Sequence, residues 1–443
     1  MMKTSLRWPS LMITLSLVFA GGCGAGGGGS TPARLPTFYP GDTAVPATGV
    51  AVPGVEPFDR NVTALLKKWN IPGASIAVAK DGQLILARGY GYADFESRQV
   101  MQPDSMFRIG SISKVLASQA ILQLRDQGTL DLDARFLDIL TDYHVAPGGD
   151  SRLRDITIRH LLQHSGGWDA GISGDPMGLQ GTISRALNIP MPVLCPDVVR
   201  YMMGRPLDFA PGTRQAYSNF GYCVLSQVIE KVSGEPFELY VRDHVLAPMD
   251  VHAMSIGYSQ SLSQRGPCEV KYYEYNGAAL VDSVFPGGGK VPTPYGGFEI
   301  LTIEAPGGWI GSTIDLTRVM TAVDGSRVAP LLLPQTTAEW VADPHLPSWF
   351  SSADYWYGLG IFVGPTPGTW YHGGAIYGAK SELVRDGSGY TWAIMTNSMT
   401  QDPAGLAGDL DLAMIGALAN GLEGSPVDLY AQYPSLPLPP RHR

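Results

Sequence analysis

The chain has 443 residues, of which 44% are hydrophobic and 16% charged, and its formal net charge is −9. This composition suits one large globular unit, or two closely packed ones, with an ample core. The acidic balance argues against a nucleic-acid-binding protein, which would need a basic surface. The 54 glycines and 35 prolines are spread along the chain and predict many loops on an ordered scaffold.

The N-terminal segment predicts export. Lys3 and Arg7 precede an apolar run over residues 11–20 that is too short to cross a membrane as a helix. The run continues into Ala20-Gly21-Gly22-Cys23, which resembles the lipobox of bacterial lipoproteins, although the usual leucine is replaced by alanine. We expect residues 1–23 to be a lipoprotein-type signal peptide and Cys23 to be lipidated, which anchors the protein in the cell envelope. Ordinary cleavage after a small residue, with Cys23 incidental, is the alternative.

The composition after Cys23 predicts the domain organisation. Residues 24–57 are rich in glycine and then in proline, and they are expected to form a flexible tether. The folded domain is predicted over residues 58–425, with a mainly helical insertion at about 131–285. Residues 426–443 are predicted to be a proline-rich tail.

Strand patterns occur at both ends of the domain. Asp81-Gly82 joins two apolar runs and predicts a hairpin. The chain is otherwise mostly helical until strand patterns return near the C-terminus. We therefore expect a mixed α/β (α+β) fold, in which one antiparallel sheet built from both chain ends is flanked by helices and receives the helical insertion. The predicted strands are 74–80, 83–91, 357–363, 369–372, 381–385 and 390–396, and the predicted helices are 62–69, 158–164, 198–203, 222–233, 237–246 and 404–422.

Ser111 and Lys114 lie three residues apart at the start of an apolar run. On a helix this spacing places both side chains on one face, within reach of each other. A serine hydroxyl is a weak nucleophile that needs a base, and a lysine serves when burial keeps it partly neutral. The run from Val115 to Leu124 leaves almost no polar face, so we expect a buried helix ended by Gly128. An exposed helix capped by Ser111 is the alternative, whereas a buried start indicates a site.

Two further stretches carry candidate site residues. Tyr217 and Asn219 precede an apolar helix, and His372 ends a predicted strand, followed by small residues. A phenol can shuttle protons if a nearby cation lowers its pKa. Asn219 either caps the helix or holds a substrate amide. Small residues after His372 would let a substrate backbone approach the sheet, and an ordinary surface histidine is the alternative.

Three cysteines remain after Cys23, an odd number for an oxidising compartment, so at most one disulfide forms among them. Cys195 and Cys268 lie next to prolines in loop-like sequence and could pair. Cys223 lies in an apolar helical run and is predicted to be a buried, unpaired side chain.

Metal binding is not expected. His160 and His164 are four residues apart, as metal-binding histidines can be, but the glutamate of a zinc-protease helix is missing between them. Packing is the better interpretation of this pair.

Taken together, the motifs resemble those of the serine β-lactamase and penicillin-binding group. The phrases over residues 160–167 and 307–315 also match this group, and the resemblance covers nearly the whole chain from about residue 58. His164-x-Gly166 also fits the third motif, but it precedes the tyrosine motif and lies at a helix end, so His372 is preferred. The three motifs, in chain order, are Ser111-x-x-Lys114, Tyr217-x-Asn219 and His372-x-Gly374.

The histidine of the third motif indicates which branch of this group the chain resembles. Class C β-lactamases usually carry Lys-Thr-Gly there, whereas His-x-Gly resembles D,D-peptidases, D-aminopeptidases and related esterases. No Gly-x-Ser-x-Gly occurs in the sequence, which excludes the nucleophile elbow of α/β-hydrolases.

The resemblance implies a β-lactamase/transpeptidase-like fold and acyl transfer through a covalent acyl-enzyme. Ser111 would attack a carbonyl, while Lys114 and Tyr217 share the role of base. Backbone N–H groups of Ser111 and Ala375 would form the oxyanion hole. Asn219 would hold the acyl side of the substrate and His372 would help polarise the site. No metal or organic cofactor is implied.

Two functional classes stay open. The first is a hydrolase of esters or D-amino-acyl amides, and the second is a catalytically quiet lipoprotein that binds penicillin, peptidoglycan or a protein partner. Retention of every reactive group favours the hydrolase. A β-lactamase proper is a further alternative, although no distinct feature indicates an optimised deacylating site. Residues 168–179 and 268–298 are expected to form the loops that set specificity.

Overall fold

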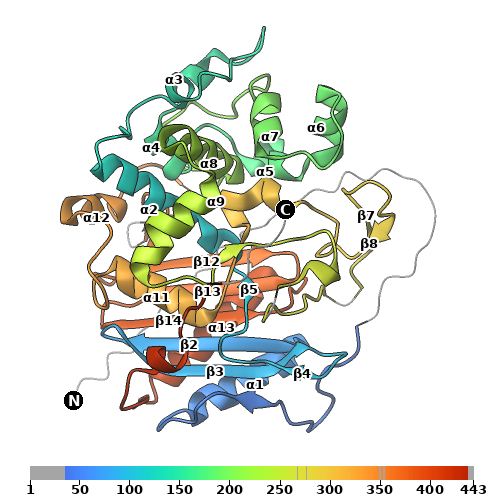
Figure 1. Ribbon diagram of the computed structural model, residues 1–443, viewed down its shortest axis with the longest axis vertical. Helices are drawn as coiled ribbons and strands as arrows, with labels where there is room; N and C mark the ends of the chain where they lie inside the picture. Colours follow the sequence, from blue (N-terminus) through green and yellow to red (C-terminus); the bar gives the residue numbers. More distant parts are fainter. Residues whose placement is uncertain (1–34, 267, 276, 349–350, 353–354, 438–443) are drawn as a thin grey trace.

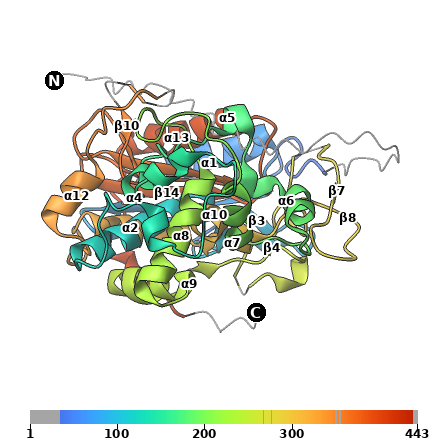
Figure 2. The ribbon, with the colours of Figure 1, turned by 90° about the horizontal axis from the view of Figure 1, so that it is seen from above.

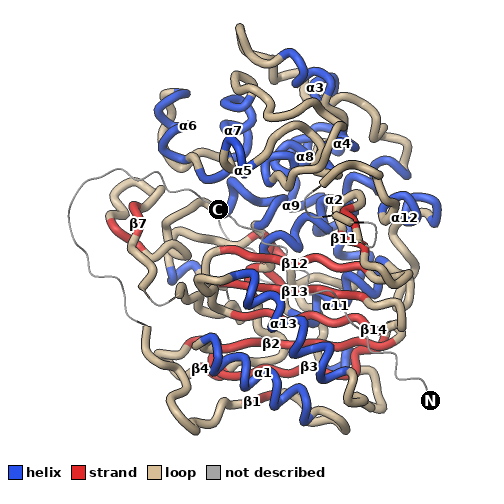
Figure 3. Tube along the Cα trace, turned by 180° about the vertical axis from the view of Figure 1, so that it is seen from behind, coloured by secondary structure: helices blue, strands red, loops and turns tan. Residues whose placement is uncertain are grey.

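The computed structural model describes residues 35–266, 268–275, 277–348, 351–352 and 355–437. Most helices gather on one side of a broad sheet, and two more cover its opposite face (Figures 1 and 3). The predicted signal peptide and Cys23 lie outside the described residues. Within these ranges, no helix is both long and apolar enough to cross a membrane.

The central sheet is antiparallel and joins the two ends of the chain, as predicted. Its strand order is β1-β3-β2-β14-β13-β12-β11-β10, with β4 paired to β3. Strands β2 and β14 connect the N-terminal and C-terminal parts, with Ala77 opposite Ala393. The strands are β1 Ala47–Thr48, β2 Gly73–Lys80, β3 Gln83–Asp94, β4 Gln99–Val100, β10 Trp356–Tyr357, β11 Phe362–Val363, β12 Trp370–Ile376, β13 Ala379–Arg385 and β14 Tyr390–Thr396.

Two turns in this sheet test the sequence prediction. The hairpin at Asp81-Gly82 is confirmed, with φ angles of 48° and 83° that match the tight turn of a two-residue loop. The predicted strand over 357–363 is instead the hairpin of β10 and β11. The backbone reverses at Gly360, where φ is 110° and an added Cβ would lie 2.5 Å from the Cβ of Ser118. A residue with a side chain would not fit there.

The helical region follows β5 (Phe107–Arg108) and ends earlier than predicted, at the turn η5 (Ala247–Met249). From residue 250 to 298 the chain is mostly loop, because glycine and proline are frequent there. The short strands β7 (Val281–Asp282) and β8 (Lys290–Val291) form a hairpin that stands out beside α6 (Figures 1 and 2). The helices of this region are α2 Ser113–Asp126, α3 Phe136–Ile139, α4 Ile158–Leu162, α5 Ala170–Ser173, α6 Gln180–Leu187, α7 Cys195–Met202, α8 Asn219–Ser233 and α9 Phe237–Tyr240.

Three helices and a small sheet complete this side of the molecule. Strand β9 (Trp309–Gly311) pairs with β5 and with β6 (Ser255–Ile256), and so ties the helical region to the sheet layer. Helix α11 packs directly on β2 and β14. The three helices are α10 Glu304–Gly307, α11 Thr313–Val323 and α12 Pro334–Trp340.

The outer face of the sheet is covered by α1 (Glu56–Trp69) and α13 (Pro403–Leu418), which pack against each other (Figure 3). Helix α1 begins six residues before its predicted start, with Pro57 in the first turn, where its missing N–H costs nothing. Side chains along β14 point alternately to the two faces of the sheet and so contribute to the core on both faces. Trp392 and Ile394 pack under these helices, while Ala393 and Met395 face the larger core on the other side.

The folded unit is longer than predicted at both ends. Phe38 and Tyr39 are buried and β1 pairs with β3, so the segment from residue 35 is not a flexible tether. The predicted tail is also packed at its start, because the Tyr430 hydroxyl is buried and donates to Thr317 Oγ1 at 3.1 Å. Both corrections have one cause: a few aromatic side chains anchor segments whose overall composition is typical of a linker.

The disulfide prediction was wrong. Cys195 is bonded to Cys223, with an S–S distance of 2.10 Å and a Cα–Cα distance of 5.8 Å, whereas Cys268 is free and exposed. Cys195 begins α7 and Cys223 lies in the first turns of α8, so the bond joins two packed helices. The apolar run around Cys223 indicated burial correctly, but burial did not exclude pairing.

Candidate active site

Ser111 lies on a 3-10 turn, η1 (Gly110–Ile112), that leads directly into α2. The turn packs against β12 so closely that a Cβ added to Gly110 would lie 2.7 Å from the backbone nitrogen of Ala375. Gly110 has a φ of 53°, which glycine adopts at no steric cost. Ser111 accepts no capping bond at the helix start, and α2 is buried along most of its length. The prediction of a buried helix behind Ser111 is therefore confirmed.

Lys114 is enclosed by three oxygen atoms. Its Nζ lies 3.2 Å from Ser111 Oγ, 2.8 Å from Asn219 Oδ1 and 2.7 Å from the carbonyl oxygen of Pro306. The side chain has 0% exposure, and this burial holds its pKa well below the ordinary lysine value, with Asp175 opposing the shift. Lys114 therefore has the environment of a lysine that acts as a base.

The three oxygen atoms also define the direction of the amine lone pair. Asn219 Oδ1 and the Pro306 carbonyl oxygen can only accept hydrogen bonds, so they take two N–H groups of the lysine. A neutral amine then has one lone pair left, and the remaining neighbour is the hydroxyl of Ser111. This geometry lets Lys114 receive the proton of the nucleophile.

Asn219 connects the lysine to a carboxylate. Its Oδ1 faces Lys114 and its Nδ2 donates to Asp175 Oδ2 at 2.6 Å, so its two neighbours define the orientation of the amide. Asp175 lies in the loop after α5, and its Oδ1 accepts a hydrogen bond from the backbone N–H of Met177 at 3.0 Å. Burial raises the pKa of Asp175, and the bonds from Asn219 and Met177 and the nearby Lys114 oppose that rise. The helix cap is Ser218, which accepts from Gly221, so Asn219 is free for the site.

Tyr217 is held beside the nucleophile by aromatic packing. Its ring centroid lies 4.2 Å from that of His164, and Lys114 Nζ lies 4.8 Å from the centre of its face. Burial raises the pKa of Tyr217 well above its usual value, and the interaction with Ser111 opposes part of the rise. The condition that a nearby cation lowers this pKa is not met, because desolvation dominates. Tyr217 is a neutral phenol, and its buried hydroxyl lies beside the Ser111 hydroxyl.

His372 lies on β12 and is completely buried. Its Nδ1 is 2.7 Å from the Gly373 carbonyl oxygen and its Nε2 is 3.2 Å from the Tyr357 hydroxyl, which is consistent with a proton on Nδ1. Burial, together with the nearby Lys114, lowers the pKa of His372 to about 3. The imidazole is thus neutral, and it is not the surface side chain of the alternative interpretation. Any polarising effect comes from its dipole rather than from a charge.

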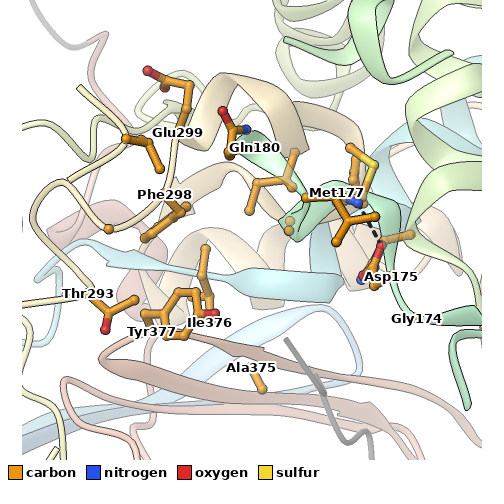
Figure 4. A pocket seen from close by; sticks show the side chains of 18 of the residues that line it. Gly174, Asp175, Met177, Gln180, Thr293, Phe298, Glu299, Ala375, Ile376 and Tyr377 are labelled. Atoms are coloured by element: carbon orange, nitrogen blue, oxygen red, sulfur yellow. Dashed lines mark hydrogen bonds between the residues drawn. The ribbon is translucent and has the colours of Figure 1, made fainter. Parts of the chain in front are cut away.

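A cavity of about 460 Å³ opens above the nucleophile. Ser111, Asn219 and Ala375 all line it, so the structure brings together residues of the first two motifs and the residue that follows the third. Figure 4 shows Ala375, Ile376 and Tyr377 on one side, with Asp175 and Met177 on a second side. The cavity walls come from both predicted specificity loops, since residues 173–179 and the segment from Val281 to Phe298 contribute to them.

The structure also shows what the third motif does locally. An added Cβ on Gly374 would lie 2.0 Å from the carbonyl oxygen of Ile109, which is also the acceptor of a 2.8 Å bond from Ser381 Oγ. Gly374 is therefore needed for the close approach of the nucleophile turn to β12 and β13. Whether the N–H groups of Ser111 and Ala375 stabilise an oxyanion stays a prediction.

Several contributing residues were missed from the sequence. Asp175 lies in a predicted specificity loop, and it was missed because it is far from the motifs in the sequence. His164 was assigned to packing, and its ring does pack on Tyr217, with its backbone in the left-handed region at a φ of 58°. Tyr357 and Pro306 contact the motif residues through a hydroxyl and a carbonyl oxygen, and neither has a sequence pattern that could have identified it.

The class of protein follows from this geometry. A serine hydroxyl at the floor of a cavity lies 3.2 Å from the amine of a buried lysine whose pKa is lowered, and a phenol lies beside both. This arrangement is typical of serine hydrolases that work through an acyl-enzyme. Groups of three or more histidine, cysteine or acidic side chains that could hold a metal are absent from the described part of the chain.

The chain belongs to the β-lactamase family, because the family model "Beta-lactamase" matches residues 58–413. Among curated proteins, Esterase EstB from Burkholderia gladioli is 27% identical over 393 residues, which cover 80% of this chain and 92% of the esterase. Protein flp from Staphylococcus aureus strain MW2 is 31% identical over 186 residues, or 42% of this chain. The match spans 35% of flp, so flp as a whole is much longer than the shared part.

Solved structures share the fold. A D-stereospecific amidohydrolase from Streptomyces sp. has a TM-score of 0.62 at 22% identity, covering 81% of this chain and 98% of its own. D-amino acid amidase from Ochrobactrum anthropi SV3 has a TM-score of 0.64 at 20% identity, covering 82% of this chain and 99% of its own. At this level of identity the similarity establishes the β-lactamase/transpeptidase-like fold only.

Proposed function

We propose that the protein hydrolyses carboxylic esters and D-amino-acyl amides through an acyl-enzyme on Ser111. One observation carries the proposal: Lys114 is completely buried, and two obligate acceptors leave its lone pair to the Ser111 hydroxyl. The similarity over most of both chains to an esterase supports ester substrates. The fold shared with amidases of D-amino acids supports D-amino-acyl amides.

The reaction begins when Ser111 Oγ attacks the carbonyl carbon and its proton passes to Lys114 Nζ. Because the phenol of Tyr217 is protonated, it donates its proton to the departing alcohol or amine and regains one from the lysine. The acyl group is then bonded to Ser111 Oγ. In the second half-reaction water attacks the acyl carbon and loses a proton to Lys114. The bond between the acyl carbon and Ser111 Oγ then breaks, Oγ takes the proton back from the lysine, and the carboxylic acid is released.

Turnover of two substrate types tests this function. Nitrophenyl butyrate and the amides of D- and L-phenylalanine are incubated with the wild type and with Ser111→Ala. The proposal predicts ester hydrolysis and a preference for the D-amide, both lost in the variant. A correctly folded wild type that hydrolyses neither substrate would instead support the catalytically quiet binding protein.

Export and lipid anchoring are a separate part of the proposal. The apolar run before Cys23, with the glycine-rich stretch after it, supports a lipidated cysteine that holds the domain at the cell envelope. Cys23→Ser should release the protein from the membrane fraction of cells, with Cys268→Ser as the matched control that stays bound. A Cys23→Ser protein that remains in the membrane fraction would contradict lipidation at this residue.

A further inference from the structure

The charges that line the cavity are all of one sign. Among the described residues of its wall, Asp175 and Glu299 are acidic and none is a lysine or an arginine. Lys114 lies behind Ser111 and is completely buried, and its low pKa makes it a poor counter-charge. A substrate with a carboxylate near the reacting carbonyl would meet no cation on the wall.

Asp175 is the acidic residue nearer to the nucleophile. Its Oδ2 accepts from Asn219, which contacts Lys114, and its Oδ1 accepts from the backbone of Met177. These bonds hold the carboxylate in one orientation. A carboxylate has about four acceptor positions, so capacity remains for a ligand in the cavity. In Figure 4 Asp175 and Glu299 lie on opposite sides of the cavity, which separates their effects.

We propose that Asp175 determines substrate specificity: it favours substrates whose acyl part carries an ammonium group and disfavours those that carry a carboxylate there. This inference rests on the proposed function and narrows its substrate class to amino-acyl compounds, with neutral esters intermediate. It also predicts that the cavity binds the carboxylate of a penicillin weakly.

The energetics support a strong effect for a single charge. Asp175 is only partly exposed, and the bonds from Asn219 and Met177 and the nearby Lys114 offset only part of the cost of burying its charge. Burial raises the pKa of its carboxyl, and a bound ammonium would remove part of that cost. Two unit charges interact more strongly in such a site than in water, by several-fold.

Three boronic acids of similar size test the inference, because a boronic acid bonds reversibly to a nucleophilic serine. The probes are 3-(aminomethyl)phenylboronic acid, 3-methylphenylboronic acid and 3-carboxyphenylboronic acid. Their Kd values are measured by calorimetry on the wild type, so the result does not depend on turnover. The proposal predicts that the ammonium probe binds at least about tenfold more tightly than the carboxylate probe, with the methyl probe between them.

Two variants then test whether Asp175 causes the preference for the ammonium probe. Asp175→Asn keeps the shape of the side chain and its bond to Asn219. It should reduce the ratio between the Kd values of the carboxylate and ammonium probes by about tenfold. Glu299→Gln is the matched control, and it should change the ratio by less than about threefold. Equal binding of the charged probes by the wild type, or a larger effect of Glu299→Gln, would overturn the inference. Ester hydrolysis by the same wild-type sample would show that the proposed function stands even then.

Discussion

The Nζ of Lys114 lies 3.2 Å from the Oγ of Ser111, at the point where two other oxygen atoms already occupy the N–H groups of the lysine. The pair depends on burial, because water around the lysine would restore its ordinary pKa. Helix α2 is buried on nearly all sides, and this burial keeps water away from the base. Burial in the core of the protein thus lowers the pKa of the lysine that faces the nucleophile.

The first prediction concerns pH. Lys114 acts as a base only when neutral, so kcat/KM should fall about tenfold per pH unit below its pKa. Since burial lowers that pKa, the fall should lie well below the ordinary lysine range. The negative charge of Asp175 favours the protonated lysine, so Asp175→Asn should move the acid limb to lower pH. An acid limb that stays in place or moves to higher pH in Asp175→Asn would contradict an effect of the Asp175 charge on Lys114. Glu299→Gln is the control, and its acid limb should stay in place.

The second prediction concerns the proton relay of Lys114 and Tyr217. If both groups act in one proton transfer, removing either should disable it, and each single loss should be about 10²–10⁴ in kcat. The double variant Lys114→Ala/Tyr217→Phe should therefore be hardly worse than either single variant. The three rate constants are measured with nitrophenyl butyrate on samples with matched circular dichroism. Multiplicative losses would mean that the two residues act independently.

The third prediction concerns the disulfide between Cys195 and Cys223. The bond closes a loop with a sequence separation of 28. Replacing both residues by alanine should lower the free energy of unfolding by about 2–4 kcal/mol. Denaturant unfolding measures the change, and Cys268→Ala should leave the midpoint in place because that thiol is free and exposed. An unchanged midpoint in the double variant would show that the bond does not form in the protein.

The fourth prediction compares esters with penicillins. Clearing a penicilloyl-enzyme needs a water molecule aimed at the acyl carbonyl with a base to activate it, whereas an activated ester has a good leaving group and needs less assistance. Short-chain nitrophenyl esters should be hydrolysed readily, while penicillins are turned over slowly or inhibit. We expect the higher kcat/KM for the ester on one preparation. A higher value for penicillin would make the protein a β-lactamase proper.

The sequence was sufficient for the architecture because its strands carry clear patterns. The strand patterns at both chain ends, with the Asp81-Gly82 turn, predicted the sheet that joins them, and the apolar run after Ser111 predicted a buried helix. Segments anchored by single aromatic residues were missed, because Phe38 and Tyr430 are isolated in linker-like sequence. Their burial depends on partners far away in the chain, which no local pattern reveals.

The candidate site was also predictable in part from the sequence. The motif residues Ser111 and Asn219 meet at one cavity as expected, since motif order and spacing carry that information. The direction of the Tyr217 pKa shift was not predictable, because it depends on the balance between desolvation and charge in three dimensions. Asp175 was missed for a related reason: an acidic residue in a loop is ordinary until Asn219 is placed beside it.

Identification of the acylated residue tests the central claim most directly. The purified protein is treated with a fluorophosphonate probe, digested, and the labelled peptide is located by mass spectrometry. We predict a single modification on Ser111, and no labelling of a folded Ser111→Ala variant, since the loss of one hydroxyl leaves the core intact. Labelling on another residue, or persistent labelling of that variant, would contradict the assignment of Ser111 as the nucleophile.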